Sequence, residues 1–152
     1  MPLIKDRQLI ENSWRFVADD EPLPEAGNIS VSLHRWLSEK TSLLQRAGQA
    51  GVRLISTEPV EAIAGDVTAL GLIELDFQNY GDGRAFSQAR ILRDRYGYRG
   101  EIRAIGNFLA DQVFYLHRVG VNAFDCKTEK DIALALAALD DFSVFYQASV
   151  NN

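Results

Sequence analysis

The sequence predicts an α/β protein in which strands and helices alternate around a mostly parallel sheet. Short apolar segments alternate with segments of helical length through most of the chain. Gly97 and Gly120 follow two of the helical segments. The two clearest strands, at residues 72–77 and 101–105, alternate charged with apolar side chains. Parallel strands joined by helices need right-handed crossovers, so we expect repeated βα units.

Residues 1–28 are the least regular part of a predicted single domain that spans residues 1–152. Short β segments are expected between residues 3 and 17. An acidic loop follows at residues 19–27, where two prolines and four acidic residues favour a solvated and irregular chain.

The regular architecture is predicted to begin at residue 29. We expect strands at residues 29–33, 52–56, 72–77, 101–105 and 121–125, and helices at residues 41–50, 59–70, 84–96, 107–119 and 129–139. Gly51 is expected to close the first helix as a left-handed cap. Pro59 suits the first turn of the second helix.

Two architectures fit this order of elements. A flavodoxin-like doubly wound sheet has helices on both faces, so its central strands are almost continuously apolar. Residues 72–77 instead place Leu72, Glu74 and Asp76 on one face and only apolar side chains on the other. Such one-sided strands are typical of barrels, but five βα-like units are too few to close one. We therefore predict a partial TIM-barrel-like sheet, with the flavodoxin-like sheet as the alternative.

An open partial barrel leaves two strand edges and a charged concave face uncovered. Unprotected edges pair readily with another chain. Closed homo-oligomers are common, so we expect a homodimer. Docking against a different protein is the alternative.

The composition excludes several classes of protein. With 152 residues, 47% apolar and 24% charged, the chain suits one globular domain. A net charge of -5 disfavours a nucleic-acid partner. Cys126 is the single cysteine, more typical of packing than of redox chemistry, and His34 and His117 lack metal-ligand spacing. We expect no metal and no cofactor. No segment resembles a signal peptide or a membrane span, so a cytoplasmic location without membrane contact is expected.

The strongest chemical candidates lie on the charged strand face. Ligands of parallel α/β sheets bind at the carboxyl ends of strands, where Asp76 lies. Arg103, which shares its strand with Glu101, is expected to approach Glu74 and Asp76 in a buried ion network. We predict Asp76, Glu101 and Arg103 as catalytic residues. The alternative of equal weight is that this network only neutralises itself and sets the strand register.

A second candidate is an anion site where residues 81–84, Gly-Asp-Gly-Arg, precede a helix. Helix N-termini favour anions, so Gly83, Arg84 and Ser87 are predicted to bind a phosphate, sulfate or sulfite-like group. Asp82 opposes an anion, and helix capping by Asp82 is the favoured interpretation.

Two further polar features belong to the helices. Asp111 and Gln112 lie in the first turns of the helix expected at residues 107–119, where an acid complements the helix dipole; a site role is the alternative. The helix at residues 84–96 carries several arginines opposite an apolar stripe. A solvated cationic face is favoured, and a docking patch for an acidic partner protein is the alternative.

The chain from about Asp76 to the C-terminus resembles a known bacterial family. The runs GRAFSQARILRDRYGYRGEIRAIGNFLADQVFYLHRVGVNAF and DDFSVFYQ are similar to Domain of Unknown Function 934. The matching motifs are Gly83-Arg84 with Ser87, Leu92-Arg93, Gly97-Tyr98, Gly100 to Ala104 with Gly106, and Asp111-Gln112. The family carries the provisional label of an oxidoreductase involved in sulfite reduction, because its genes lie near those for sulfite reductase.

The resemblance implies a link to sulfite reduction, but not the reduction itself. Six-electron reduction of sulfite needs sirohaem and an iron–sulfur cluster, and a chain with one cysteine cannot ligate such a cluster by itself. We expect a cytoplasmic accessory protein that docks on sulfite reductase or another sulfur-assimilation protein and binds a small anion. Whether it is an enzyme stays open. The alternative is a small partial-barrel enzyme for an anionic metabolite, with Asp76 as acid/base and Arg84 and Arg103 orienting the substrate. A dimeric scaffold is a third hypothesis.

Overall fold

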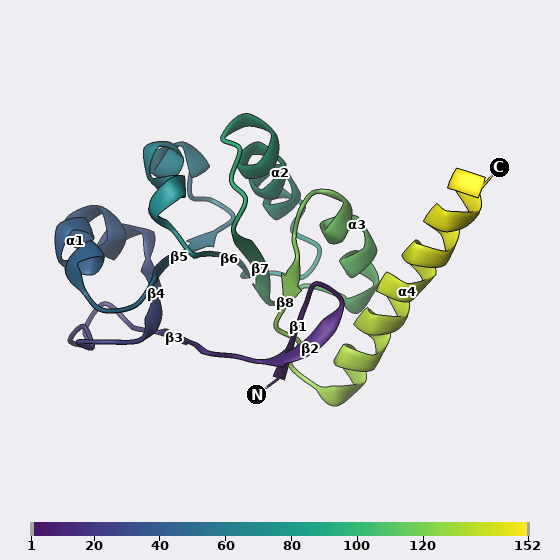
Figure 1. The fold of residues 1–152 in the computed structure, drawn as a ribbon, viewed down its shortest axis with the longest axis horizontal. Coiled ribbons are helices and arrows are strands. Elements are labelled where there is room, and N and C mark those ends of the chain that lie inside the picture. Colours follow the sequence, from purple (N-terminus) through teal and green to yellow (C-terminus); the bar gives the residue numbers. More distant parts are fainter. Residues whose placement is uncertain (1, 152) are drawn as a thin grey trace.

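The strands form one curled sheet that stays open on one side, as a computed structural model shows (Figure 1). The structure describes residues 2–151, with side chains for residues 2–140. The strands are β1 (Pro2–Lys5), β2 (Gln8–Glu11), β3 (Trp14–Phe16), β4 (Asn28–Ser32), β5 (Ala50–Ile55), β6 (Leu72–Phe77), β7 (Glu101–Gly106) and β8 (Ala123–Phe124). The helices are α1 (Leu33–Gln45), the 3₁₀ helix η1 (Val60–Ala69), α2 (Arg84–Arg90), the π-helical η2 (Ile91–Arg95), the 3₁₀ turn η3 (Ala110–Gln112), α3 (Val113–Arg118) and α4 (Glu129–Asn151).

The sheet order confirms the predicted partial barrel. The strands follow the order β2-β1-β8-β7-β6-β5-β4-β3. Strands β3 to β8 pair in parallel, whereas β1 pairs antiparallel with both β8 and β2. Helices α1, α2 and α3 lie on the convex side of the arc (Figure 1). A sheet covered by helices on one face only is a half barrel and not a doubly wound sheet.

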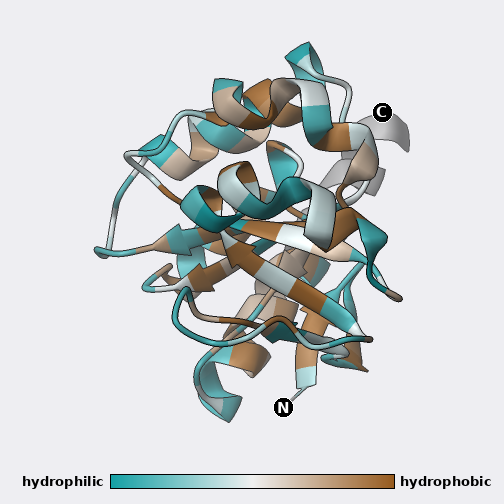
Figure 2. Ribbon diagram, turned by 90° about the vertical axis from the view of Figure 1, so that its left-hand side faces the viewer, coloured by the Kyte–Doolittle hydropathy of each residue, from teal (hydrophilic) through white to brown (hydrophobic). Residues whose placement is uncertain are grey.

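The core lies between the convex face and these helices. The outward side chains of β6, Ile73, Leu75 and Phe77, are at most 1% exposed. Ala89 and Leu92 cover them from the helical side and are completely buried, which confirms the predicted apolar stripe of α2 and η2. Figure 2 shows the hydrophobic colour concentrated in the strands and the hydrophilic colour in loops and helix ends. Within the described residues no helix combines the length and apolarity needed to cross a lipid bilayer.

The chain between β2 and β3 crosses the open side of the arc. These strands are consecutive in sequence but lie at opposite edges of the sheet, so the chain crosses the concave face (Figure 1). Asn12 Oδ1 accepts hydrogen bonds from Arg103 Nη1 at 3.1 Å and from the Trp14 amide at 2.9 Å. The Phe16 ring lies 3.8 Å from the Arg53 guanidinium carbon. This crossing takes the place of the strands that a closed barrel would have.

The first helix differs from the prediction for residues 41–50. Helix α1 begins at Leu33, because Ser32 Oγ accepts a hydrogen bond from the Arg35 amide at 3.1 Å and caps the helix there. Gly51 is not a helix cap but lies inside β5. A Cβ atom at Gly51 would meet the Leu72 carbonyl oxygen at 2.7 Å. The glycine is therefore required by the close approach of β6.

Other boundaries also differ from the prediction. Within residues 1–28 the structure has the short strands β1, β2 and β3, as predicted for the segment between residues 3 and 17. Strand β8 spans only two residues, and helical structure after β7 begins at Ala110 and not at residue 107. Helix α4 continues to Asn151, since neither glycine nor proline interrupts it.

Strand β2 forms one open edge of the sheet. All four of its residues are exposed, with Leu9 at 52% and Ile10 at 37%. An uncovered edge of this kind suits pairing with a second chain. The predicted homodimer stays a prediction.

Substitution Gly51→Ala should lower the free energy of unfolding by about 1–3 kcal/mol, because the new methyl group meets backbone atoms of β6 that cannot move freely. Gly65→Ala is the matched control, since nothing lies within 4 Å of its Cβ position. Urea denaturation of both variants measures the difference. Equal stabilities would contradict the close contact between β5 and β6.

Candidate functional site

The concave face of the half barrel carries charged side chains in successive layers. The strand register places Arg53, Glu74 and Arg103 side by side on β5, β6 and β7. One layer nearer the carboxyl ends, Asp76 lies between Ile55 and Ile105. The charges that alternate along these strands therefore all point into the same interior.

The layer around Glu74 is held by an ion pair with Arg53. Arg53 Nε and Nη2 donate to the two carboxylate oxygens of Glu74 at 3.1 and 3.3 Å. Ser30 Oγ donates to the same carboxylate at 2.5 Å. Sequence reasoning missed Arg53, although its place between Val52 and Leu54 repeats the one-sided pattern of β6. Glu74 is 4% exposed, so its charge requires these partners.

Arg103 makes a separate pair with Glu101. Arg103 Nε and Nη2 lie 2.7 and 2.6 Å from Glu101 Oε2, and Lys5 Nζ lies 3.2 Å from Glu101 Oε1. The prediction that Arg103 joins Glu74 and Asp76 in one network is therefore wrong. Glu101 precedes Arg103 by two residues, so it shares the same strand face and is the nearer carboxylate.

The Glu101–Arg103 pair is sealed at the amino-terminal side of the interior. Arg103 is 2% exposed and Glu101 6% exposed, and both are covered by contacts with Lys5 and Asn12. These contacts attach the N-terminal strands to the parallel sheet. The catalytic role of Glu101 and Arg103 stays a prediction, whereas the geometry itself gives them a structural role.

Asp76 lies at the carboxyl end of β6, where the interior opens. Its Oδ2 accepts a hydrogen bond from Gln78 Nε2 at 2.9 Å. Burial raises the pKa of Asp76, while the positive charge of Arg53 opposes that rise and the negative charge of Glu74 adds to it. Gly106 on β7 borders the carboxylate so closely that a Cβ atom there would lie 2.5 Å from Asp76 Oδ1.

A second carboxylate, that of Asp125, faces the same opening. The Asp125 amide donates to the Ala104 carbonyl at 3.0 Å, which continues the pairing of β8 with β7. Burial raises the pKa of Asp125 too, and Arg103, Glu74 and Arg53 act on it electrostatically. Asp125 is the last residue of the strand predicted at residues 121–125, so its place at a strand end can be read from the sequence. Two carboxyl groups with raised pKa thus lie at the same end of the barrel, one near the end of β6 and one directly after β8.

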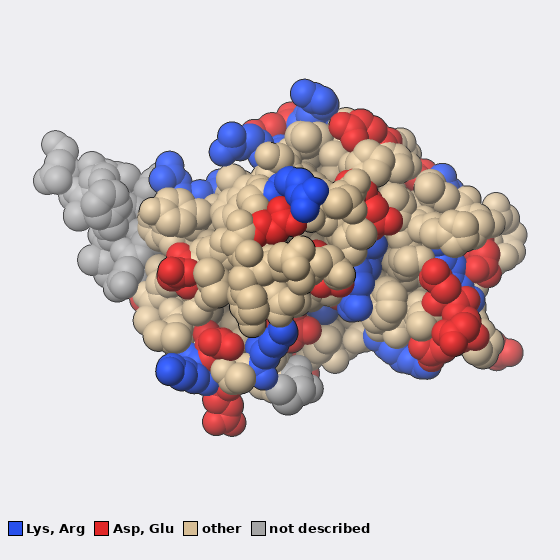
Figure 3. Space-filling model, turned by 180° about the vertical axis from the view of Figure 1, so that it is seen from behind, with Lys and Arg blue, Asp and Glu red and all other residues tan. Residues whose placement is uncertain are grey.

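A chain of hydrogen bonds extends this site across the rim. Gln78, which donates to Asp76, accepts at its carbonyl oxygen from Asn107 Nδ2 at 2.9 Å. Asn107 Oδ1 accepts from Lys127 Nζ at 2.5 Å. The rim therefore links loops that follow β6, β7 and β8. Figure 3 views this carboxyl-end face and shows basic and acidic side chains interspersed on it.

In the loop before α2, Asp82 binds Arg84, the first residue of the helix, while Gly83 is the N-cap residue. Asp82 Oδ1 accepts from the Arg84 amide at 3.0 Å, and Asp82 Oδ2 accepts from Arg84 Nη2 at 3.0 Å. Ser56 Oγ also donates to Asp82, and these bonds hold the pKa of Asp82 well below its usual range. Because the charge of Arg84 is already paired, the anion site of Gly83, Arg84 and Ser87 stays a prediction without further support.

Asp111 and Gln112 lie in η3, beside the same carboxyl-end face. Gln112 Oε1 accepts a hydrogen bond from the Leu109 amide at 2.8 Å, so this side chain closes the turn that starts the helix. Asp111 is exposed in the first turn, a position where an acidic side chain interacts favourably with the helix dipole. The hydrogen bond of Gln112 gives this side chain a structural role, and the site role of the pair stays a prediction.

The arginines after β6 divide into two kinds. Arg93 is not a surface residue, because its guanidinium donates to the carbonyl oxygens of Gly120, Tyr98 and Gly100 at 2.7–3.0 Å. Arg90 borders a groove of about 480 Å³ together with Arg118 and the exposed Tyr115. Neither Arg90 nor Arg118 has an ion-pair partner among the side chains of residues 2–140.

The family model described as "Bacterial protein of unknown function (DUF934)" matches residues 51–152, which is more than half of the chain. The match begins in β5 and covers β6, β7 and β8, so it includes Arg53, Asp76 and Asp125. No curated protein matches the chain.

Substitution Asp76→Asn should make the protein more stable than the wild type at pH 7. A raised pKa means that the folded state favours the protonated carboxyl group of Asp76. Ionisation of this group as the pH rises therefore lowers the free energy of unfolding, and the asparagine variant, which does not ionise, avoids that loss. The advantage should vanish as the pH falls below the ordinary aspartate pKa of 3.8. Thermal unfolding between pH 3 and pH 8 measures it.

Asp82→Asn serves as the control of opposite sign. The pKa of Asp82 is lowered, so its ionised form stabilises the folded protein and the amide variant should be less stable at pH 7. If both variants changed stability in the same direction, the burial assigned to Asp76 would be contradicted.

Proposed function

The chain belongs to DUF934, a family of bacterial proteins of unknown function, and we propose that it is a small partial-barrel enzyme that acts on an anionic metabolite at the carboxyl-end opening. The observation that carries this proposal is that Asp76 and Asp125 are both partly buried at the carboxyl ends of their strands, where Arg53 acts electrostatically on each of them. Carboxyl ends of parallel strands are where barrel folds place their reacting groups. Likeness of fold alone would not assign chemistry, so the residues themselves must do so.

Arg53 is suited to orient an anionic substrate. Its Nε and Nη2 atoms bind Glu74, which fixes the plane of the guanidinium. Its Nη1 atom donates to no group within the described residues, and the side chain is 27% exposed. Because Glu74 already fixes the guanidinium, the Nη1 atom can donate to a ligand oxygen without further loss of side-chain entropy. Arg53 takes the orienting role that the sequence pattern had suggested for Arg84 and Arg103.

Asp76 is suited to accept and return a proton. Its raised pKa brings the carboxyl group closer to the operating pH, where an acid/base group is most effective. An anion bound at Arg53 adds negative charge beside Asp76 and favours the protonated carboxyl group. Binding should therefore be accompanied by proton uptake and should weaken as the pH rises.

A screen of carboxylate, phosphate and sulfur-containing anions by thermal shift tests this proposal. A ligand that stabilises the protein should lose affinity with Arg53→Lys, because an ammonium group cannot form the planar pair of hydrogen bonds that Arg53 makes with Glu74. Turnover of that ligand should fall by about 10²–10⁴-fold with Asp76→Asn, while binding persists. Asp111→Asn, at the exposed rim, is the control. A broad screen without any stabilising anion would contradict the proposal.

A second proposal is that the protein is a cytoplasmic accessory factor of assimilatory sulfite reduction that docks on sulfite reductase or a related enzyme. The groove bordered by Arg90, Arg118 and Tyr115 favours it, since arginine and tyrosine are enriched in protein interfaces. The two arginines are positive, have no ion-pair partner among the described side chains, and belong to a chain of net charge -5. An acidic partner surface would complement them.

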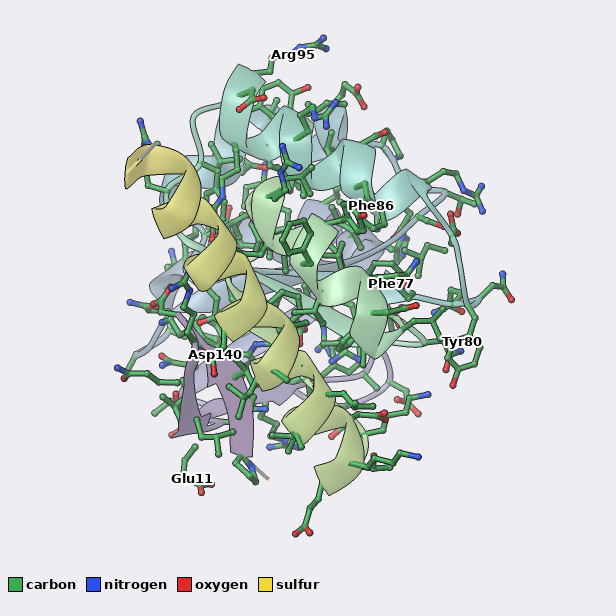
Figure 4. The ribbon with its side chains drawn as sticks, turned by 90° about the vertical axis from the view of Figure 1, so that its right-hand side faces the viewer. Glu11, Phe77, Tyr80, Phe86, Arg95 and Asp140 are labelled. Carbon is green, nitrogen blue, oxygen red and sulfur yellow. The ribbon has the colours of Figure 1, made fainter. Side chains whose placement is uncertain are left out.

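Gel filtration of the protein mixed with sulfite reductase tests this docking. The double substitution of Arg90→Glu and Arg118→Glu should weaken the complex by about tenfold or more, because it places like charges against an acidic partner. Arg95→Glu is the matched control. Arg95 lies at the periphery of the molecule, away from the groove (Figure 4). Independent elution of the unsubstituted protein and the reductase at micromolar concentration would contradict the docking.

A further inference from the structure

A pocket of about 350 Å³ lies beside Asp76 at the carboxyl-end face. Its walls are mainly apolar and comprise Tyr80, Phe108, Leu109 and Ala110, with Gly106 and the buried Cys126 completing them. Lys127 and Asp131 provide the charged groups at its border. Figure 4 shows Tyr80 at the same end of the molecule as Phe77, the last residue of β6. The three loops that follow β6, β7 and β8 therefore build this pocket together.

The apolar wall is rigid at its base and exposed at its rim. The Phe108 ring packs against Phe77 and Phe124, with ring centroids 6.0 Å apart in both pairs. Tyr80 is 62% exposed and Leu109 40% exposed, although both are large and partly apolar. Exposed apolar side chains gathered around a concavity are a sign of ligand binding, because a surface without a ligand gains nothing from them.

Gly106 is the wall shared by this pocket and the acid/base site. A Cβ atom at Gly106 would lie 2.5 Å from Asp76 Oδ1 on one side, and the same residue lines the pocket on the other. The hydrogen bonds through Gln78 and Asn107 also connect Asp76 to Lys127. A molecule in the pocket would thus contact Gly106, which itself borders Asp76.

Few polar groups line the pocket. Burial raises the pKa of Cys126 to about 11, so its thiol remains neutral and adds to the apolar wall. Lys127 donates to Asn107 and has further donor hydrogens for a ligand. No ion pair within 4.0 Å joins Lys127 to Asp131 among the residues with described side chains.

We propose that the ligand of this site is an organic anion with an apolar group of about the size of a ring, and not an inorganic oxyanion such as sulfite or phosphate. The apolar group lies against Tyr80, Phe108 and Leu109, and the anionic group that Arg53 orients also lies toward Lys127. This substrate class rests on the proposed enzyme function of the same opening. A bare oxyanion would leave the aromatic and aliphatic walls in contact with water and would gain nothing from them.

Phenylacetate, acetate and sulfite are suitable probes, with binding to the full chain measured by NMR titration. Phenylacetate should bind about tenfold more tightly than acetate or sulfite, because only it covers the apolar walls. Leu109→Asp should remove most of that preference, and Lys127→Gln should weaken phenylacetate and acetate alike. Leu37→Asp and Lys130→Gln are the matched controls on exposed helix positions away from the pocket.

The outcomes separate this inference from the enzyme proposal. Equal affinity for phenylacetate and acetate, or no detectable phenylacetate binding at millimolar concentration, overturns the substrate class. Phenylacetate binding that is lost in Leu109→Asp supports the substrate class. It does so even if Asp76→Asn leaves the pH dependence of phenylacetate binding unchanged, a result that would contradict the acid/base role of Asp76. Sulfite binding that depends on Arg53 and not on Leu109 overturns the substrate class while it supports an anion site.

Discussion

The pairing of Arg103 with Glu101 inside the half barrel is the interaction on which the rest of the structure depends. Burying two charges is costly unless each finds partners, and here Asn12 and Lys5 supply the remaining ones. Both of these residues belong to the N-terminal segment, so the same contacts that satisfy the pair attach β1, β2 and the crossing chain to the parallel sheet. A half barrel has no second set of strands to fill its interior. In this protein the N-terminal segment, with its hydrogen bond and ion pair to Arg103 and Glu101, occupies the interior instead.

The two ends of the interior differ in how completely their charges are satisfied. At the amino-terminal end Arg103 and Glu101 are almost fully buried and closely paired. At the carboxyl end Asp76 and Asp125 are partly exposed, and burial raises the pKa of both carboxyl groups. Carboxyl groups with a raised pKa lower the stability of the protein at neutral pH. Proteins commonly tolerate such a loss at residues that have a functional role. The contrast supports the proposal that the amino-terminal end of the barrel is structural and that the carboxyl end is the reacting one.

Two surfaces favour two different activities. The opening beside Asp76 combines an apolar pocket with a few polar groups, which is the usual character of a small-molecule site. The groove with Arg90 and Arg118 lies between α2, η2 and α3 on the convex side and has the composition of a protein interface. An accessory factor and an enzyme are therefore compatible with one another in this chain. An organic ligand in the pocket would also separate the chemistry of this protein from the reduction of sulfite itself.

Sequence by itself determined the alternation of strands and helices, the one-sided strands and the half barrel, because periods of two and 3.6 residues are local properties of the chain. It also placed Asp76 at a strand end, since that needs only the limits of one strand. Only the tertiary structure decided which charges meet: Glu74 pairs with Arg53 on the neighbouring strand, and Arg103 with Glu101 on its own. The pocket around Phe108 was equally out of reach, because it depends on loops distant in sequence that the curvature of the sheet brings to one end.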